Sequence, residues 1–309
     1  MWENDSMLGN SKVDTITVTT NLSNVTHDVV EHDHINFHTY TVTANPEVPY
    51  RGKFIILHGW AEHSPMYINQ LEFLAMLGYD YLIYDQRGSG QTSKGKYRGR
   101  SGRYSTVALT DLDFMIEHFT QGEGEINLIG HSMGGSIALS YMQSGKYRSK
   151  INSVIVTSPL IRLSPSKQPT WLRVSLASLI TLLFPYFHHY EEQDPAVVEN
   201  VTHNTKWQAY LLENESCQPV GTIKQMLQLI SRGEDLLQTA SEVESNAKLL
   251  IFQSEQDIIV DANASRDYFD RVPLDVKKFE SMPNSGHAIF LENDSVLDSV
   301  KRIISEFLG

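Results

Sequence analysis

The chain has 309 residues, of which 41% are hydrophobic and 20% are charged, and its formal net charge at pH 7 is −12. This length and composition suit one large folded domain with an insertion and exclude a disordered chain. The negative charge argues against nucleic acid and against attraction to anionic lipid, so any lipid contact is expected to be apolar. Because Cys217 is the single cysteine and the N-terminus lacks the pattern of a secretory signal, we expect a cytoplasmic protein, peripheral at a membrane if it meets one.

The first part of the chain predicts strands and one helix. Two segments carry β-branched residues with period two, and two later ones are short apolar runs that suit strands buried in a parallel sheet. The predicted strands are residues 13–20, 35–43, 53–58 and 79–84. A helix is expected at 64–77, where apolar residues follow helical spacing, and 21–34 is expected to be a polar connection.

Three features of this region suggest ligand sites only weakly. The histidines at 27, 32, 34 and 38 lack a cysteine or acidic ligand set, so a solvated surface is expected and no metal. Asp85–Gly90 lacks G-x-G-x-x-G, so it predicts a tight turn in which Asp85 and Arg87 pair or bind backbone groups. The basic loop 91–104 favours a solvated surface over the alternative of a phosphate contact.

The stretch 126–135 has the pattern of a nucleophile elbow. An apolar strand runs into Gly130–Gly134, which fits G-x-S-x-G and is followed by a helical segment. Such a turn strains the backbone of the serine, so Ser132 is expected to present its hydroxyl as a nucleophile, although an incidental glycine-rich turn is the alternative. The Met133 amide would donate to a developing oxyanion, and the Trp60 amide, after strand 53–58, is the expected second donor.

The later segments complete an alternation of strands and helices. A helix at 106–120 and a strand at 151–157 flank the elbow, and together they indicate an α/β fold with a mostly parallel, doubly wound sheet. The alternation resumes after residue 246 with segments at 247–252, 261–271, 276–280 and 296–307. We therefore expect residues 1–159 and 246–309 to form the core, and 160–245, in which no strand is predicted, to form a helical cap near the carboxyl edge of the sheet.

The most apolar helix of the chain is predicted within this cap, at 171–184. At 14 residues it is too short to span a bilayer. It is either a core helix or a lid, and its place in the insertion favours the lid. As a lid, its Leu179 and Leu183 would line an acyl channel, and the helix would touch lipid surfaces transiently.

Partners for the serine follow in the chain. Asp257 comes after the penultimate predicted strand and His287 after the last, which is the order that hydrolases with a nucleophile elbow require. An imidazole activates the serine hydroxyl, and a carboxylate orients the imidazole. Asp261 is the competing acid, but its position favours capping of the next helix, and His131 is expected to be structural.

Four motifs together resemble the monoacylglycerol lipase and lysophospholipase branch of the α/β-hydrolase superfamily. They are His58-Gly-Trp-Ala-Glu-His63, Asp85-Gln-Arg-Gly-Ser-Gly90, Gly130-His-Ser-Met-Gly-Gly135 and Ser285-Gly-His287. The resemblance runs from about residue 30 to the C-terminus, with departures at Ser89, where the family usually has histidine, and around Cys217. It implies nucleophile, acid and base at Ser132, Asp257 and His287, oxyanion donors at Trp60 and Met133, and no metal or organic cofactor.

The resemblance implies hydrolysis of carboxylic esters of lipids, either lysophospholipids or monoacylglycerols, through an acyl-enzyme intermediate. An aminopeptidase or small-ester hydrolase is the alternative, since serine aminopeptidases share the signature, and Glu191, Glu192 and Asp194 would then hold a substrate ammonium group. A non-catalytic binding protein is a third hypothesis. The sequence leaves the acyl length, the head group and the oligomeric state open.

Overall fold

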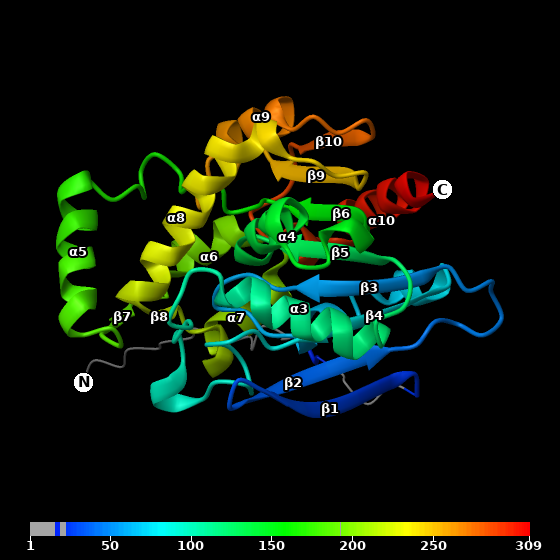
Figure 1. The fold of residues 1–309 in the computed structure, drawn as a ribbon, viewed down its shortest axis with the longest axis horizontal. Helices are drawn as coiled ribbons and strands as arrows, with labels where there is room; N and C mark the ends of the chain where they lie inside the picture. Colours follow the sequence, from blue (N-terminus) through cyan, green and yellow to red (C-terminus); the bar gives the residue numbers. More distant parts are fainter. Residues whose placement is uncertain (1–15, 19–22, 192) are drawn as a thin grey trace, which may run out of the picture.

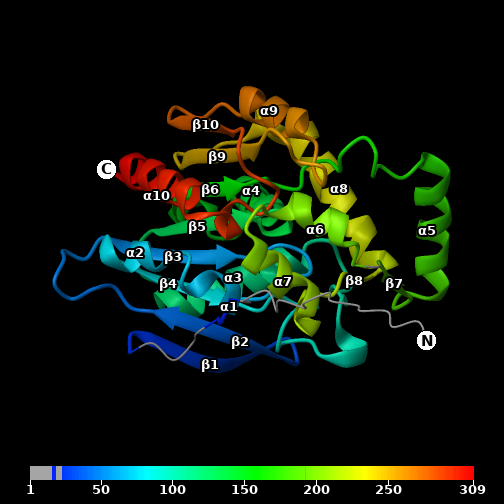
Figure 2. The same ribbon diagram turned by 180° about the vertical axis from the view of Figure 1, so that it is seen from behind.

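The computed structural model describes residues 16–18, 23–191 and 193–309. Its centre is an eight-stranded sheet with helices on both faces (Figures 1 and 2). The strand order is β1-β2-β4-β3-β5-β6-β9-β10; β2 pairs antiparallel with β1 and β4, and all other neighbours are parallel. The strands are β1 Val25–His32, β2 Ile35–Val42, β3 Gly52–Leu57, β4 Tyr79–Tyr84, β5 Ile126–His131, β6 Ile151–Thr157, β9 Lys248–Ser254 and β10 Lys277–Met282. The predicted α/β fold is confirmed.

The antiparallel pair at the sheet edge begins later than the sequence predicts. β1 lies within 21–34, which was expected to be a polar connection. Asp33 and His34 have φ values of 50° and 60°, and two successive left-handed residues form the tight turn whose twist suits a hairpin. β1 is an edge strand with mostly exposed side chains, so its polar residues are tolerated. Residues 16–18 have no regular structure, and the rest of the predicted strand at 13–20 lies outside the described residues.

The prediction of one continuous helix at 64–77 is wrong, because the segment forms two short helices, α1 Pro65–Ile68 and α2 Glu72–Met76. The Ile68 carbonyl accepts a hydrogen bond of 2.6 Å from the Tyr81 hydroxyl of β4. The apolar residues of both pieces are still buried against the sheet. Packing against the strands therefore replaces part of the helical hydrogen bonding.

The sheet separates two hydrophobic cores. Along β3 the side chains alternate, so that Ile55 and Leu57 enter one core and Phe54 and Ile56 the other. The first core is covered by α3 Val107–Thr120, α4 Met133–Ser144, α8 Ile223–Thr239 and α9 Ala262–Arg271. The second is covered by α1, α2 and α10 Asp294–Leu308 (Figure 2). Both faces of the central strands are buried, as their continuous apolar sequence predicts.

Residues 160–245, the segment expected to form a cap, lie between β6 and β9 and contain a small sheet as well as helices. Besides α8, this segment holds α5 Trp171–Leu183, α6 Pro195–Val201, α7 Thr205–Glu213 and the antiparallel strands β7 His188–Tyr190 and β8 Val220–Thr222. The expectation that it has no strand is therefore wrong. A distant loop anchors this pair of strands, because the Thr222 amide donates to the Gly99 carbonyl at 2.9 Å. A three-residue strand that depends on such a contact cannot be recognised from its own sequence.

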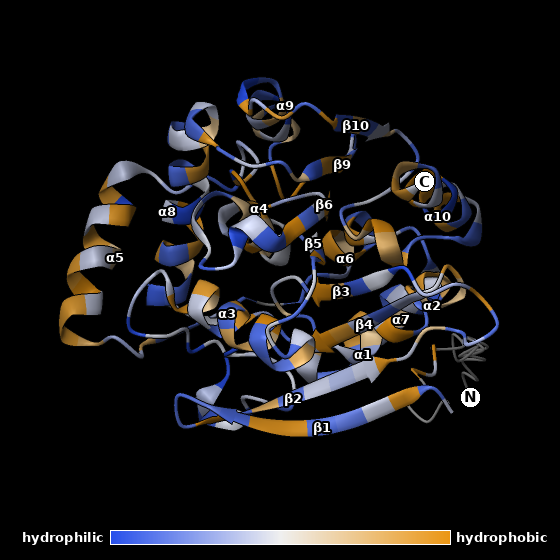
Figure 3. Ribbon diagram, turned by 45° about the vertical axis from the view of Figure 1, so that its right-hand side comes forward, coloured by the Kyte–Doolittle hydropathy of each residue, from blue (hydrophilic) through white to orange (hydrophobic). Residues whose placement is uncertain are grey.

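Helix α5 stands away from the sheet at one end of the molecule (Figures 1 and 3). None of its residues is buried, and Leu179 and Leu183 are 57% and 72% exposed. The alternative of a core helix is thus wrong. Throughout the described ranges, no helix combines the length and apolar character needed to cross a bilayer.

Candidate active site

Ser132 lies in a strained turn between β5 and α4. Its φ of 51° and ψ of −113° are unusual for a residue with a side chain, as the elbow motif predicts. The Ser132 amide donates to the Thr157 carbonyl at 3.0 Å, and its carbonyl accepts from the Leu160 amide at 2.9 Å. A Cβ on Gly134 would lie 2.1 Å from the Leu57 carbonyl oxygen, so only glycine allows α4 to approach β3 here. The neighbouring strands therefore hold the strained serine in place.

Asp257 and His287 form a buried hydrogen-bonded pair. The Asp257 Oδ2 to His287 Nδ1 distance is 2.7 Å, and the two side chains are 0% and 7% exposed. The amides of Ile259 and Val260 donate to Asp257 Oδ1 at 2.8 and 2.9 Å. Burial by itself would raise the pKa of Asp257, but His287 and these amides outweigh it and lower that pKa. Asp257 is therefore held as a carboxylate that fixes Nδ1 of His287 as a donor and turns Nε2 away from it.

The topology brings this pair to the edge of the sheet where Ser132 lies. The strands β5, β6, β9 and β10 are parallel neighbours, so the loops after them meet at their carboxyl ends. The His287 ring packs on the ring of His131, with 4.8 Å between centroids, and His131 directly precedes Ser132. Within the part of the chain that the structure describes, the Ser132 hydroxyl forms no hydrogen bond, so it is free for another partner.

Asp261 has a different role from Asp257. It is the N-cap residue of α9, where Oδ1 accepts from the Asn263 amide at 3.0 Å. The second carboxylate oxygen lies 3.6 Å from Arg162 Nη1. The predicted capping role of Asp261 is confirmed.

The loop after β3 carries Trp60 and is anchored by Glu62, which the sequence analysis did not single out. Glu62 Oε2 accepts from the Gly59 amide at 2.5 Å and from the Tyr67 hydroxyl at 2.6 Å. Among the residues that the structure describes, neither the Trp60 amide nor the Met133 amide has a hydrogen-bond partner. Free N–H groups, one in the loop after β3 and one at the first residue of α4, are what an oxyanion site requires. The sequence signal for the Glu62 contact was the spacing, because a glutamate three residues after Gly59 can reach back to its amide.

His131 is buried beneath His287 and contacts three groups. Its Nδ1 lies 3.1 Å from the Thr157 carbonyl oxygen, and its Nε2 lies 3.5 Å from Glu62 Oε1. Burial lowers the pKa of His131 to about 4, with His287 adding to the shift and Glu62 opposing it. A histidine that is neutral at pH 7 and held between two elements supports the His287 ring, in agreement with the structural role expected for it.

In the turn at 85–90, Asp85 and Arg87 do not pair with each other, which was one of the two arrangements expected. Asp85 accepts from the amides of Ser64 and Gln91 at 2.7 and 2.6 Å, so it binds backbone as expected. Arg87 pairs instead with Asp111, through hydrogen bonds of 2.7 and 2.9 Å. The turn therefore ties the loop before α1 to β4.

The carboxylates considered for an aminopeptidase have other partners. Glu191 lies 3.6 Å from His189 and is half-exposed, and Asp194 caps α6 by accepting from the Ala196 amide at 2.9 Å. Glu192 lies outside the described residues. In the described part of the chain, no group of three or more histidine, cysteine or acidic residues is placed to bind a metal ion.

The family described as serine aminopeptidase S33 matches residues 49–294. The chain belongs to this family. It is a hydrolase of the α/β-hydrolase superfamily, and the fold class and the resemblance seen in the sequence are confirmed.

Relatives of the chain are described as monoglyceride lipases. One from Saccharomyces cerevisiae is 27% identical over 84% of this chain and 84% of its own length. A putative monoglyceride lipase from Schizosaccharomyces pombe is 27% identical over 78% of this chain, which spans only 62% of that protein. The structure of a soluble variant of the Saccharomyces cerevisiae enzyme, in complex with a substrate analog, superimposes with a TM-score of 0.81 at 25% identity, covering 95% of this chain and 98% of the other. These similarities place the chain in the monoacylglycerol lipase branch.

Proposed function

We propose that this protein is a serine hydrolase that cleaves carboxylic esters of lipids through an acyl-enzyme intermediate. The observation that carries the proposal is the Asp257–His287 hydrogen bond of 2.7 Å, at the sheet edge where Ser132 occupies its strained turn. The protein is a carboxylic ester hydrolase, as its relatives named monoglyceride lipase support. The aminopeptidase alternative has the description of the family in its favour, but Glu191 and Asp194, expected to hold a substrate ammonium group, contact His189 and the Ala196 amide instead.

In the proposed mechanism, Ser132 attacks the ester carbonyl while Nε2 of His287 takes the hydroxyl proton. Asp257 holds His287 in the tautomer that makes Nε2 a base and stabilises the imidazolium that forms. The amides of Trp60 and Met133 donate to the oxyanion of the tetrahedral intermediate. The imidazolium then protonates the alcohol as it leaves. In the second half of the reaction, His287 takes a proton from water, the water oxygen attacks the acyl-enzyme carbonyl, and the bond to Ser132 breaks as His287 returns the proton to the serine oxygen.

We assign the insertion the role of a cap, with α5 as the part that meets lipid. The exposed apolar side chains of α5 and its C-cap include Trp171, Leu176, Leu182 and Phe184, and a group of exposed apolar residues marks a surface that contacts lipid or protein. The exposure of Leu179 and Leu183 supports transient contact with a lipid surface, from which a long-chain substrate would pass toward Ser132. The sequence expectation that these two leucines line an acyl channel stays a prediction.

The test is labelling with a fluorophosphonate together with turnover of four substrate classes: monoacylglycerols, lysophospholipids, p-nitrophenyl butyrate and aminoacyl amides. We expect labelling and ester turnover in the native protein, and loss of both in Ser132→Ala. A folded Ser132→Ala variant that keeps more than about a tenth of the rate would refute Ser132 as nucleophile. Absence of labelling and turnover in the native protein would instead favour a non-catalytic binding protein.

A further inference from the structure

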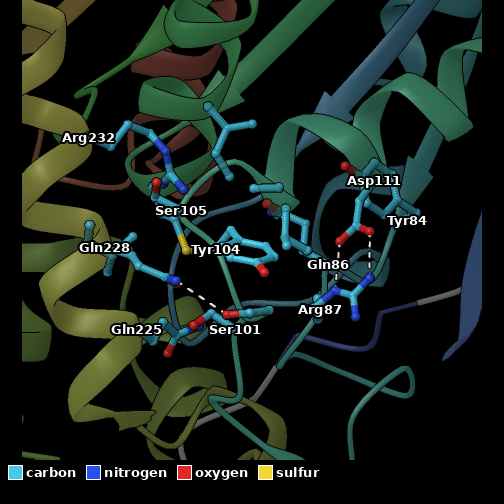
Figure 4. Close-up of a pocket in the computed structure, with 16 residues that line it drawn as sticks. Tyr84, Gln86, Arg87, Ser101, Tyr104, Ser105, Asp111, Gln225, Gln228 and Arg232 are labelled. Atoms are coloured by element: carbon cyan, nitrogen blue, oxygen red, sulfur yellow. Dashed lines mark hydrogen bonds and ion pairs between the residues drawn. The ribbon is translucent and has the colours of Figure 1, made fainter. Parts of the chain in front are cut away.

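A pocket lies beside Met133, between α8 and the loop 101–105 (Figure 4). The polar side chains in its wall include Gln225, Gln228 and Arg232 of α8 and Ser101, Tyr104 and Ser105 of the loop. Met133 and Ile137 of α4 close the side toward the elbow. Gln225 also accepts a hydrogen bond of 3.2 Å from Nε1 of Trp60. The pocket therefore adjoins both residues to which we assign oxyanion donors.

Arg232 is a buried cation without a partner. It is 9% exposed, and among the described residues its guanidinium takes part in no hydrogen bond or ion pair, with Nη1 wholly buried. Burial lowers the pKa of Arg232 to about 10, against the opposing effect of Asp235, so it remains charged at neutral pH. An unpaired charge in the interior is strongly unfavourable. In Figure 4 its side chain extends from α8 toward Ser105 and the pocket.

A second unpaired group lines the same pocket. Five buried side-chain polar atoms have no partner in the described part of the chain, and they include Nη1 of Arg232, Oγ of Ser101 and Nε of the adjacent Arg100. Two of the five, Nη1 of Arg232 and Oγ of Ser101, belong to side chains that line this pocket. The other charges of the wall, Arg87 and Asp111, satisfy each other through two hydrogen bonds (Figure 4). The pocket therefore has one uncompensated positive charge and a free hydroxyl.

The loop that supplies part of the pocket wall is positive in an otherwise acidic protein. The loop 91–104, which supplies part of the wall, carries Lys94, Lys96, Arg98, Arg100 and Arg103. No aspartate or glutamate occurs between Asp85 and Asp111. In a chain with a net charge of −12, this concentration of cations attracts anions to one place.

We propose that this pocket binds a phosphate group on the alcohol part of the substrate, so that the enzyme prefers a monoacylglycerol phosphate to a neutral monoacylglycerol. The inference rests on the proposed function of Ser132. A guanidinium and a hydroxyl supply the fixed donors that a phosphate accepts. Because Met133 forms the wall of the pocket and its amide faces the reacting carbonyl, a phosphate bound at Arg232 stays close to the ester of the same molecule.

The test compares 1-oleoylglycerol 3-phosphate with 1-oleoylglycerol in mixed detergent micelles. In the native protein we expect a higher kcat/KM for the phosphate substrate. Arg232→Met should lower kcat/KM for that substrate about 10- to 100-fold, as loss of a hydrogen bond to a charged group does, and leave 1-oleoylglycerol within about two-fold. Arg232→Lys should retain part of the preference, and Ser101→Ala should reduce it about 3- to 10-fold.

Matched controls separate the two proposals. Lys206→Met removes one exposed cation from α7 and should change neither substrate. If neither oleoyl ester is hydrolysed and a fluorophosphonate does not label the native protein, the proposed function fails. If both esters are hydrolysed but Arg232→Met affects them equally, only the phosphate pocket is wrong.

Direct binding is measured by the shift in thermal unfolding with glycerol 3-phosphate and with inorganic phosphate at equal concentrations. The proposal predicts stabilisation by glycerol 3-phosphate, a smaller effect of inorganic phosphate, and neither effect in Arg232→Met. Equal stabilisation by both anions would overturn the head-group assignment in favour of a free-phosphate site. Stabilisation by neither would mean a pocket filled by water only, and a lower melting temperature of Arg232→Met without ligand would indicate a structural arginine.

Discussion

Replacing Asp257 by asparagine should abolish most of the activity, whereas the same change at Asp261 should not. The asparagine carbonyl can still accept from the amides of Ile259 and Val260, so the loop is expected to keep its shape. Its NH2 group, however, would face Nδ1 of His287, which now donates at 2.7 Å. His287 would have to adopt the other tautomer, with the proton on Nε2, where it cannot accept one from Ser132. We expect kcat to fall about a thousand- to ten-thousand-fold.

The control is Asp261→Asn, four residues away. Asparagine caps helices as well as aspartate does, so the bond to the Asn263 amide is retained and only the partly exposed pair with Arg162 is lost. The assay is hydrolysis of p-nitrophenyl butyrate, with circular dichroism to confirm folding. A folded Asp257→Asn variant with more than about a tenth of the native rate, or a large loss in Asp261→Asn, would refute the assignment of the acid.

The remaining predictions concern the lid, the oxyanion loop and pH. Changing Leu179 and Leu183 to serine should lower vesicle binding and long-chain turnover but not butyrate turnover. Because both side chains are exposed, the unfolding free energy should change by less than about 0.5 kcal/mol. Equal losses of turnover on both substrates would contradict this role. Glu62→Gln weakens the acceptor of the Gly59 amide, so kcat should fall about ten-fold with little change in KM, and an unaltered kcat would count against the anchoring role. Because the folded pKa of His131 is about 4 and its ordinary value is 6.5, the unfolded chain binds more protons between them. The contribution of His131 to the unfolding free energy should therefore drop by on the order of 3 kcal/mol as pH falls through this range, in addition to the contribution of His63, whose pKa is also lowered to about 4. Urea titrations should find a shallower drop in His131→Gln, and an identical slope would contradict the role assigned to His131.

The sequence predicted those parts of the fold whose determinants are local. The elbow around Ser132 could be predicted because a strand, a strained turn and a helix need particular residues at fixed spacing. In the structure Ser132 has a φ of 51°. The strands 79–84 and 151–157 were predicted to the residue, since an apolar run buried on both faces has few other uses. The pairing of Asp257 with His287 could be predicted because their order along the chain follows the order of the last two strands.

Tertiary contacts decided the rest. β1 was missed because an edge strand tolerates polar residues, and the helix at 64–77 divides where the Ile68 carbonyl turns to Tyr81. Whether the helix at 171–184 was core or lid depended on what packs against it, which its own composition does not encode. The partnerless state of Arg232 likewise depends on which side chains the fold places around it. An amino-acid sequence specifies backbone preferences over a few residues, but burial, pairing and charge compensation are properties of neighbours brought together from distant parts of the chain.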